Sequence, residues 1–167
     1  MSMSTGTNSR REVRSLIFHL LYALESSEYS IPVDDVAKSF NDELELDNKI
    51  DEEVITITQS IVDKKDQLSA IMLPFLSHWR LDRIGCCTRL ILYIAFWEMH
   101  FSKTPRTIII NEAIELAKCF AEKDAYKFVN GILDEAAKQF PAEEAGSELI
   151  KDEFLDDLDD DSKEGFE

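Results

Sequence analysis

Three arginines close to the start of this 167-residue sequence have the chemistry needed to bind phosphate groups. Arg10, Arg11 and Arg14 stand at the expected start of a helix, where positive charge opposes the helix dipole and is mildly unfavourable. The planar guanidinium group donates several hydrogen bonds to phosphate oxygens and stacks on nucleic-acid bases. On these residues alone a solvated basic turn is the simpler interpretation, and an RNA contact is the alternative.

A second candidate site lies in residues 110–131, INEAIELAKCFAEKDAYKFVNG, where two helical patterns meet around a polar turn. The second helix begins near Asp124, whose side chain could cap its exposed backbone amides. We predict a site at this inter-helix corner. The competing interpretation makes Asp124 a plain cap and Phe128 a core residue. The polar residues of the corner are Lys118, Lys123, Asp124, Lys127 and Asn130.

Catalytic, metal and cofactor sites find no support in the sequence. The histidines lie on or beside apolar stripes without matched nucleophiles or carboxylates, and no glycine-rich phosphate loop is present. The three cysteines lack the paired spacing of a zinc site and are interpreted as reduced thiols. We therefore predict a protein that is not an enzyme and binds no cofactor. The residues concerned are His19, His78, His100, Cys86, Cys87 and Cys119.

The elements that must position these residues are predicted to be helices only. Between residues 7 and 140 there are two glycines and three prolines, and no alternating strand pattern. The stretch 52–67 is rich in Val, Ile and Thr, so a short strand is the competing interpretation there. The stretch 88–101 is apolar on nearly every side, which indicates a buried central helix. We expect helices over 10–25, with Ser9 as its cap, over 32–44, 52–67, 68–77 and 88–101, and on both sides of the corner.

The amino-acid sequence of residues 110–131, with Pro105 before it, resembles that of the NusB family of bacterial transcription antitermination factors. The resemblance continues upstream through LDRI at 81–84, LYIAFWE at 92–98 and the N-terminal arginines, so it covers roughly residues 10–140. It implies a compact all-α domain of about seven helices in two small bundles.

The same resemblance implies a function and a set of partners. The family members are non-catalytic RNA-binding adaptors that bind boxA-type RNA of ribosomal RNA leaders together with the ribosomal protein NusE, within the RNA polymerase antitermination complex. A homodimer is left open. The implied RNA-binding residues are Arg10, Arg11, Arg14, Lys118, Asp124, Lys127 and Phe128, and the implied partner-binding residues are Asp82, Arg83 and Thr88.

The alternative function is a helical protein-binding module that docks basic ribosomal proteins without contacting RNA. Three departures from the family pattern favour it: Glu12 replaces a basic residue, Thr88 an acidic one and Ala125 a serine. The retained arginines and the intact KFVNG sequence favour the RNA adaptor.

Charge divides the chain into a helical domain and an acidic tail. The whole chain carries 34 acidic and 18 basic residues, a net charge of −16. Residues 141–167 hold 12 acidic residues and 2 lysines, which leaves 22 acidic and 16 basic residues, a net of −6, for residues 1–140. We predict disorder at 1–8 and in the tail, 141–167, and a folded domain over 9–140. The tail acts either as a solubilising segment or as one that folds on a partner. No apolar run approaches the roughly 20 residues of a membrane span and no secretory signal is present, so we expect a cytoplasmic protein.

Overall fold

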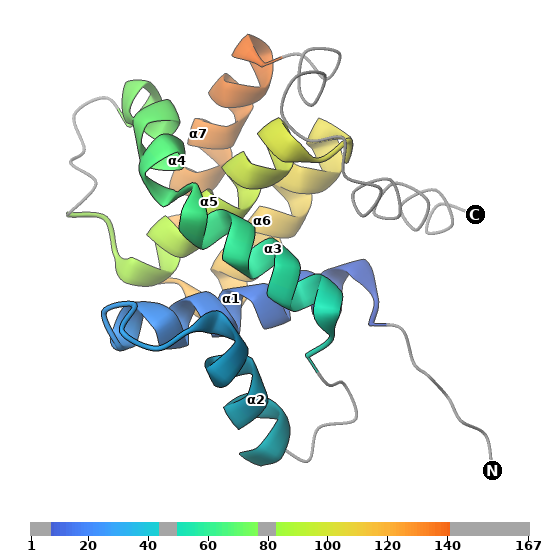
Figure 1. Cartoon of the computed structure of the whole chain (residues 1–167). Helices are drawn as coiled ribbons and strands as arrows, with labels where there is room; N and C mark the ends of the chain where they lie inside the picture. Colours follow the sequence, from blue (N-terminus) through green and yellow to red (C-terminus); the bar gives the residue numbers. More distant parts are fainter. Residues whose placement is uncertain (1–7, 44–49, 77–82, 141–167) are drawn as a thin grey trace. The chain divides into compact units, whose positions relative to one another are not determined.

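The computed structural model describes residues 8–43, 50–76 and 83–140, and within these ranges the protein is entirely helical (Figure 1). The all-α prediction is confirmed. Two compact units divide the chain, one ending at Ser60 and the other beginning at Ile61. The elements are α1 (Arg10–Ser26), α2 (Val33–Glu43), α3 (Glu52–Asp63), α4 (Lys65–Met72), the 3-10 helix η1 (Leu73–Phe75), α5 (Cys86–Phe101), α6 (Arg106–Phe120) and α7 (Ala125–Gln139).

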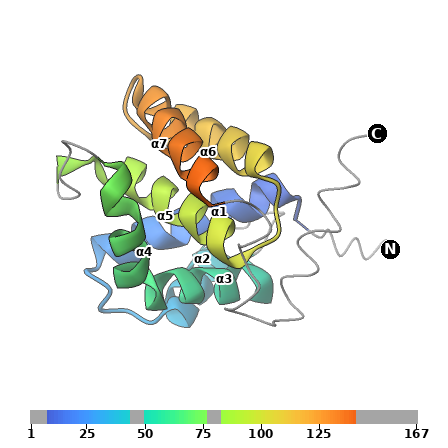
Figure 2. The same ribbon diagram turned by 90° about the horizontal axis from the view of Figure 1, so that it is seen from above.

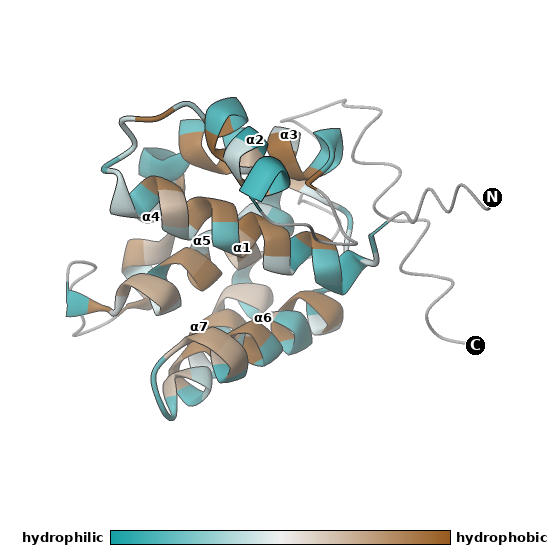
Figure 3. Cartoon of the chain, turned by 90° about the horizontal axis from the view of Figure 1, so that it is seen from below, coloured by the Kyte–Doolittle hydropathy of each residue, from teal (hydrophilic) through white to brown (hydrophobic). Residues whose placement is uncertain are grey.

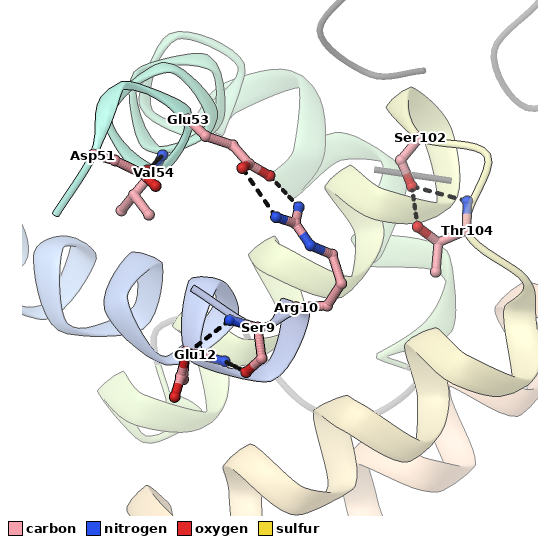
Figure 4. A network of polar contacts seen from close by, with 8 residues as sticks. All are labelled: Ser9, Arg10, Glu12, Asp51, Glu53, Val54, Ser102 and Thr104. Carbon is pink, nitrogen blue, oxygen red and sulfur yellow. Dashed lines mark hydrogen bonds and ion pairs between the residues drawn. The ribbon is translucent and has the colours of Figure 1, made fainter. Parts of the chain in front are cut away.

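The start of the first helix is fixed by a capping box, which confirms the predicted role of Ser9. The Ser9 hydroxyl accepts a hydrogen bond from the backbone amide of Glu12 at 3.2 Å, and the Glu12 carboxylate accepts one from the Ser9 amide at 2.7 Å (Figure 4). From there α1 buries one apolar face and packs against α2. The buried apolar residues of α1 are Val13, Ile17, Phe18, Leu20, Leu21 and Leu24.

The turn between α1 and α2 contains two consecutive non-glycine residues with left-handed backbone. The φ angles of Glu28 and Tyr29 are 55° and 58°, a conformation that costs an L-residue on the order of 1 kcal/mol. The Tyr29 amide donates to the Leu24 carbonyl at 2.8 Å, and the Tyr29 hydroxyl donates to the Glu25 carboxylate at 2.6 Å. These bonds hold the turn, which reverses the chain and leaves Ile31 exposed.

The segment after α2 forms two helices whose boundary differs from the prediction. We expected helices over 52–67 and 68–77, whereas α3 ends at Asp63 and α4 begins at Lys65. The strand alternative is wrong, because the buried hydroxyl of Thr58 donates to the Val54 carbonyl one helical turn back, at 2.7 Å.

The second unit is built around α5, as the sequence predicts. Nearly every residue of α5 is buried, and the helix packs against α4, α6 and α7. Helices α6 and α7 form a hairpin and lie side by side (Figure 2). Figure 3 shows that these two helices carry both hydrophobic and hydrophilic residues, which fits helices with one buried and one exposed face. The hairpin turn therefore lies at the surface of this unit, and it carries the predicted corner.

Candidate nucleic-acid interface

The three N-terminal arginines differ in how accessible their side chains are. Both terminal nitrogens of Arg10 contact the Glu53 carboxylate on α3, with the Nη2 to Oε2 distance at 3.0 Å, and the two side chains are only 16% and 22% exposed (Figure 4). Arg14 is buried, with 7% of its surface exposed. Arg11 is exposed. Of the three arginines, Arg11 is therefore the one whose side chain is most accessible to a ligand.

The corner between α6 and α7 combines two lysines with one aromatic ring. Lys118 lies in the last turn of α6 and Lys127 in the first turn of α7. Their ammonium nitrogens lie 5.2 and 5.9 Å from the centre of the Tyr126 ring, within cation–π range. The two lysine side chains are 50% and 67% exposed. This lysine–tyrosine cluster, Lys118, Tyr126 and Lys127, presents cations for phosphates and a ring for bases.

Tyr126 is not among the site residues predicted from the sequence. The ring is only partly buried, so it is available at the surface of the cluster. The signal in the sequence was its position directly before Lys127, but the approach of Lys118 depends on how α6 and α7 pack. The spacing of residues along a single helix does not show how that helix packs against its neighbour.

Asp124 does not cap α7, so the cap interpretation is wrong. Its φ angle is 67°, in the left-handed region, and its side chain makes no capping hydrogen bond. A capping side chain requires extended backbone geometry, which directs its oxygen toward the free amides. The Asp124 carboxylate lies instead 3.7 Å from the ammonium of Lys127. Asp124 therefore lowers the positive charge of the lysine–tyrosine cluster.

A small cleft of about 170 Å³ lies at the start of α5 and brings together residues that the sequence assigned to two different sites. Arg83 and Thr88 come from the predicted partner surface, and Phe128 comes from the predicted RNA surface. Asp82, the third predicted partner residue, lies outside the described residues. The lining consists of Arg83, Ile84, Gly85, Thr88, Glu122, Ala125 and Phe128.

The Glu122 carboxylate lies against Gly85 at the start of α5, so a larger residue at position 85 would require this exposed side chain to move. Its carboxylate occupies the space that a Cβ atom on Gly85 would need. Burial, and then the charge of Glu122, raises the pKa of the neighbouring Cys87 thiol above its usual value of 9.0. The Cys87 thiol, next to Thr88 in the sequence, therefore ionises less readily than an ordinary cysteine. The cleft itself carries one anion, Glu122, and one exposed cation, Arg83.

Within residues 8–43, 50–76 and 83–140, no group of three or more His, Cys, Asp or Glu side chains could hold a metal ion. In the same ranges, no helix has both the length and the apolar character required to cross a membrane.

Comparisons with known proteins agree with one another. The model of the NusB family matches residues 11–138. The transcription antitermination protein NusB of Macrococcus caseolyticus is 31% identical over 130 residues, which cover 78% of this chain and 97% of that protein. The protein of the same name from Helicobacter pylori strain Shi470 is 33% identical over 131 residues, covering 78% and 94%. The solved structure of T. maritima NusB matches with a TM-score of 0.71 and 27% identity, and the match covers 83% of this chain and 97% of that one.

Proposed function

The chain belongs to the NusB family, and from that membership we propose that it is a non-catalytic adaptor in transcription antitermination. It binds boxA-type RNA of ribosomal RNA leaders together with the ribosomal protein NusE, and it joins the RNA polymerase antitermination complex in the cytoplasm. The protein acts by assembly, with no chemical step of its own.

The observation that carries the RNA contact is the lysine–tyrosine cluster. Residues 1–140 carry a net charge of −6, so their average field repels phosphates and any RNA contact depends on local cations. Lys118 and Lys127 supply two such cations beside an aromatic ring, the combination that single-stranded RNA binding uses. Their ion pairs with Glu115 and Asp124 are exposed and contribute little, so both lysines can turn to phosphates.

A titration of boxA-type RNA against the Lys118→Ala/Lys127→Ala variant, repeated over a range of salt concentrations, tests the proposal. Loss of two phosphate contacts to a single strand should reduce the slope of log affinity against log salt by about 1.4. Lys138→Ala is the matched control, because Lys138 is an exposed lysine near the other end of α7. An equal reduction in both variants would show that general charge, and not this cluster, drives binding.

The N-terminal arginines require separate substitutions, because a triple alanine variant would disturb the fold. Arg14 is buried and Arg10 is paired with Glu53, so their loss changes stability as well as RNA binding. Arg11→Ala removes the exposed member alone and is expected to weaken RNA binding, and thermal unfolding of the same variant separates this effect from any loss of stability. An unchanged affinity would remove α1 from the proposed RNA surface.

Partner binding is proposed for the cleft at the start of α5, which contains Arg83 and Thr88. Thr88 is 4% exposed, so the side chains that could meet a partner there are those of Arg83 and Glu122. Glu122 supplies an acidic group next to Thr88, and this suits a basic partner. The alternative function, docking of basic ribosomal proteins without RNA, is distinguished by titrating NusE and RNA separately. Binding of NusE alone, with RNA affinity unaffected by the lysine variants, would favour that alternative.

A further inference from the structure

An apolar groove on the first unit has no role in the proposed function. It has a volume of about 350 Å³ and lies between the end of α1, the α1–α2 turn and α2. The turn contributes Ile31, which is 44% exposed although it is a large apolar residue. The lining of this α1–α2 groove consists of Ala23, Ile31, Val36, Ser39, Phe40 and Glu43.

The groove is built by helix periodicity and by the strained turn. Val36, Phe40 and Glu43 are spaced four and seven residues apart, so they lie along one face of α2. Val36 is buried and forms the floor, whereas Phe40 is only half-buried. Ile31 follows the left-handed pair Glu28 and Tyr29 by two residues, and it contributes to the lining from the turn. An exposed apolar surface of this kind, next to polar residues, is typical of an interaction site.

The charge around the groove restricts what can occupy it. Helix α2 carries four acidic residues and one lysine, a net charge of −3. Glu43 lines the groove itself, and the exposed Asp35 and Asp42, seven residues apart, follow one flank of the helix. The acidic segment 141–167 would be repelled. A second copy related by a two-fold axis would bring one α2 against another, with −3 facing −3.

We propose that the α1–α2 groove docks a basic amphipathic helix of a partner protein. Apolar side chains of that helix, spaced three and four residues apart, enter between Ile31 and Phe40, in the way that helices occupy hydrophobic grooves elsewhere. Lysine or arginine side chains on the flanks of the same helix face Glu43, Asp35 and Asp42. This surface uses none of the residues assigned above to RNA or to NusE.

The test is an NMR titration of the 15N-labelled full chain with a synthetic helical peptide of lysine and leucine, the leucines spaced at i, i+3, i+4 and i+7. Amide shifts should concentrate at residues 23, 31, 36, 39, 40 and 43. Ile31→Ser should weaken binding roughly fivefold, because it removes an apolar contact at the edge of the groove. Glu43→Lys should weaken binding to a similar degree. Shifts concentrated outside α1 and α2 would overturn the proposal.

Two controls separate docking from general charge attraction. Leu73→Ser removes a comparably exposed apolar residue, 54% exposed, from the other unit and should leave peptide binding unchanged. A lysine–alanine peptide of the same charge measures attraction to the acidic chain as a whole, and the preference for the leucine peptide should disappear in Ile31→Ser.

Two outcomes would show that the groove is not the docking site. One is that Leu73→Ser weakens binding as much as Ile31→Ser. The other is that a glutamate–leucine peptide of matched length binds as well as the lysine–leucine peptide. No RNA is present, so this result is independent of the RNA titration.

Discussion

His100 on α5 is a partly buried histidine whose ring packs against aromatic neighbours. Its ring centre lies 4.5 Å from that of Phe140, and Nδ1 donates to the Phe96 carbonyl at 3.1 Å. Burial is the main reason that the pKa of His100 is lowered from 6.5. The hydrogen bond to Phe96 opposes this shift with a smaller effect, and the charge of Arg106, the smallest of the three, lowers the pKa further. The folded protein therefore resists protonation at this position.

This pKa shift predicts a loss of stability in mild acid. The unfolded chain takes up the His100 proton first, so the contribution to stability is complete above pH 6.5 and falls as the pH drops through 6.5 toward the lower folded pKa. Urea unfolding at pH 7.5 and 5.5 should show a smaller drop in His100→Gln than in the parent. His19→Gln, which alters an exposed histidine, should keep the full drop. Equal drops in all three proteins would contradict the assignment.

Asp124 leads to a second stability prediction, because its backbone is left-handed and its side chain caps nothing. Asp124→Gly should stabilise the protein by up to about 1 kcal/mol, since glycine adopts a positive φ without steric cost. Ser9→Ala, at a true cap, should instead cost about 1 kcal/mol. Thermal unfolding measures both. A lower melting temperature for Asp124→Gly would mean that the carboxylate stabilises the corner after all.

The sequence could predict which residues gather at the corner, but not how each one is used. Residue type and spacing located Lys118, Asp124 and Lys127 correctly near one turn. The left-handed φ of Asp124 depends on how the chain passes from α6 into α7, and Asp is acceptable in both a cap and a left-handed position. The burial of Arg14 was likewise hidden, because a polar residue type gives no sign of a packed environment.

At the scale of whole elements, the contact between Arg10 and Glu53 connects the start of α1 to the start of α3. Glu53→Gln removes a partly buried, charge-assisted pair and should cost about 1 to 2 kcal/mol in urea unfolding. The same change releases Arg10, so RNA binding should become tighter if Arg10 is a ligand. Glu52→Gln, at the exposed neighbouring position, should change neither quantity. A destabilised variant with unaltered RNA affinity would assign Arg10 a purely structural role.

Element type was easier to predict than element boundaries. The apolar periodicity and the scarcity of glycine and proline indicated helices, and Ser9 identified the start of α1. The break at Lys64 was not predictable, because the buried positions Ile61, Leu68 and Met72 continue a helical spacing across it. The contact between Arg10 and Glu53 joins residues 43 positions apart, and no local pattern reports such a distance.

For the molecule as a whole, the uneven charge predicts that residues 141–167 oppose RNA binding. Truncation after Phe140 removes a net charge of −10 and should tighten binding, most at low salt, where screening is weakest. RNA titrations at matched salt measure this effect. A chain with the same tail residues in scrambled order separates bulk charge, which scrambling preserves, from a specific tail contact. Unaltered affinity after truncation would show that the segment does not oppose RNA binding, which leaves the solubilising role and the binding of another partner.

Because α5 is apolar on nearly every side, the order of synthesis affects how long its surface stays exposed. Helix α5 ends at Phe101, but α7, one of the helices that cover it, ends at Gln139, 38 residues later. At roughly 5 to 20 residues per second, the ribosome needs about 2 to 8 s to synthesise the residues between the end of α5 and the end of α7. During that interval the face of α5 that α7 will cover stays exposed, and such exposed apolar surface favours aggregation of the nascent chain.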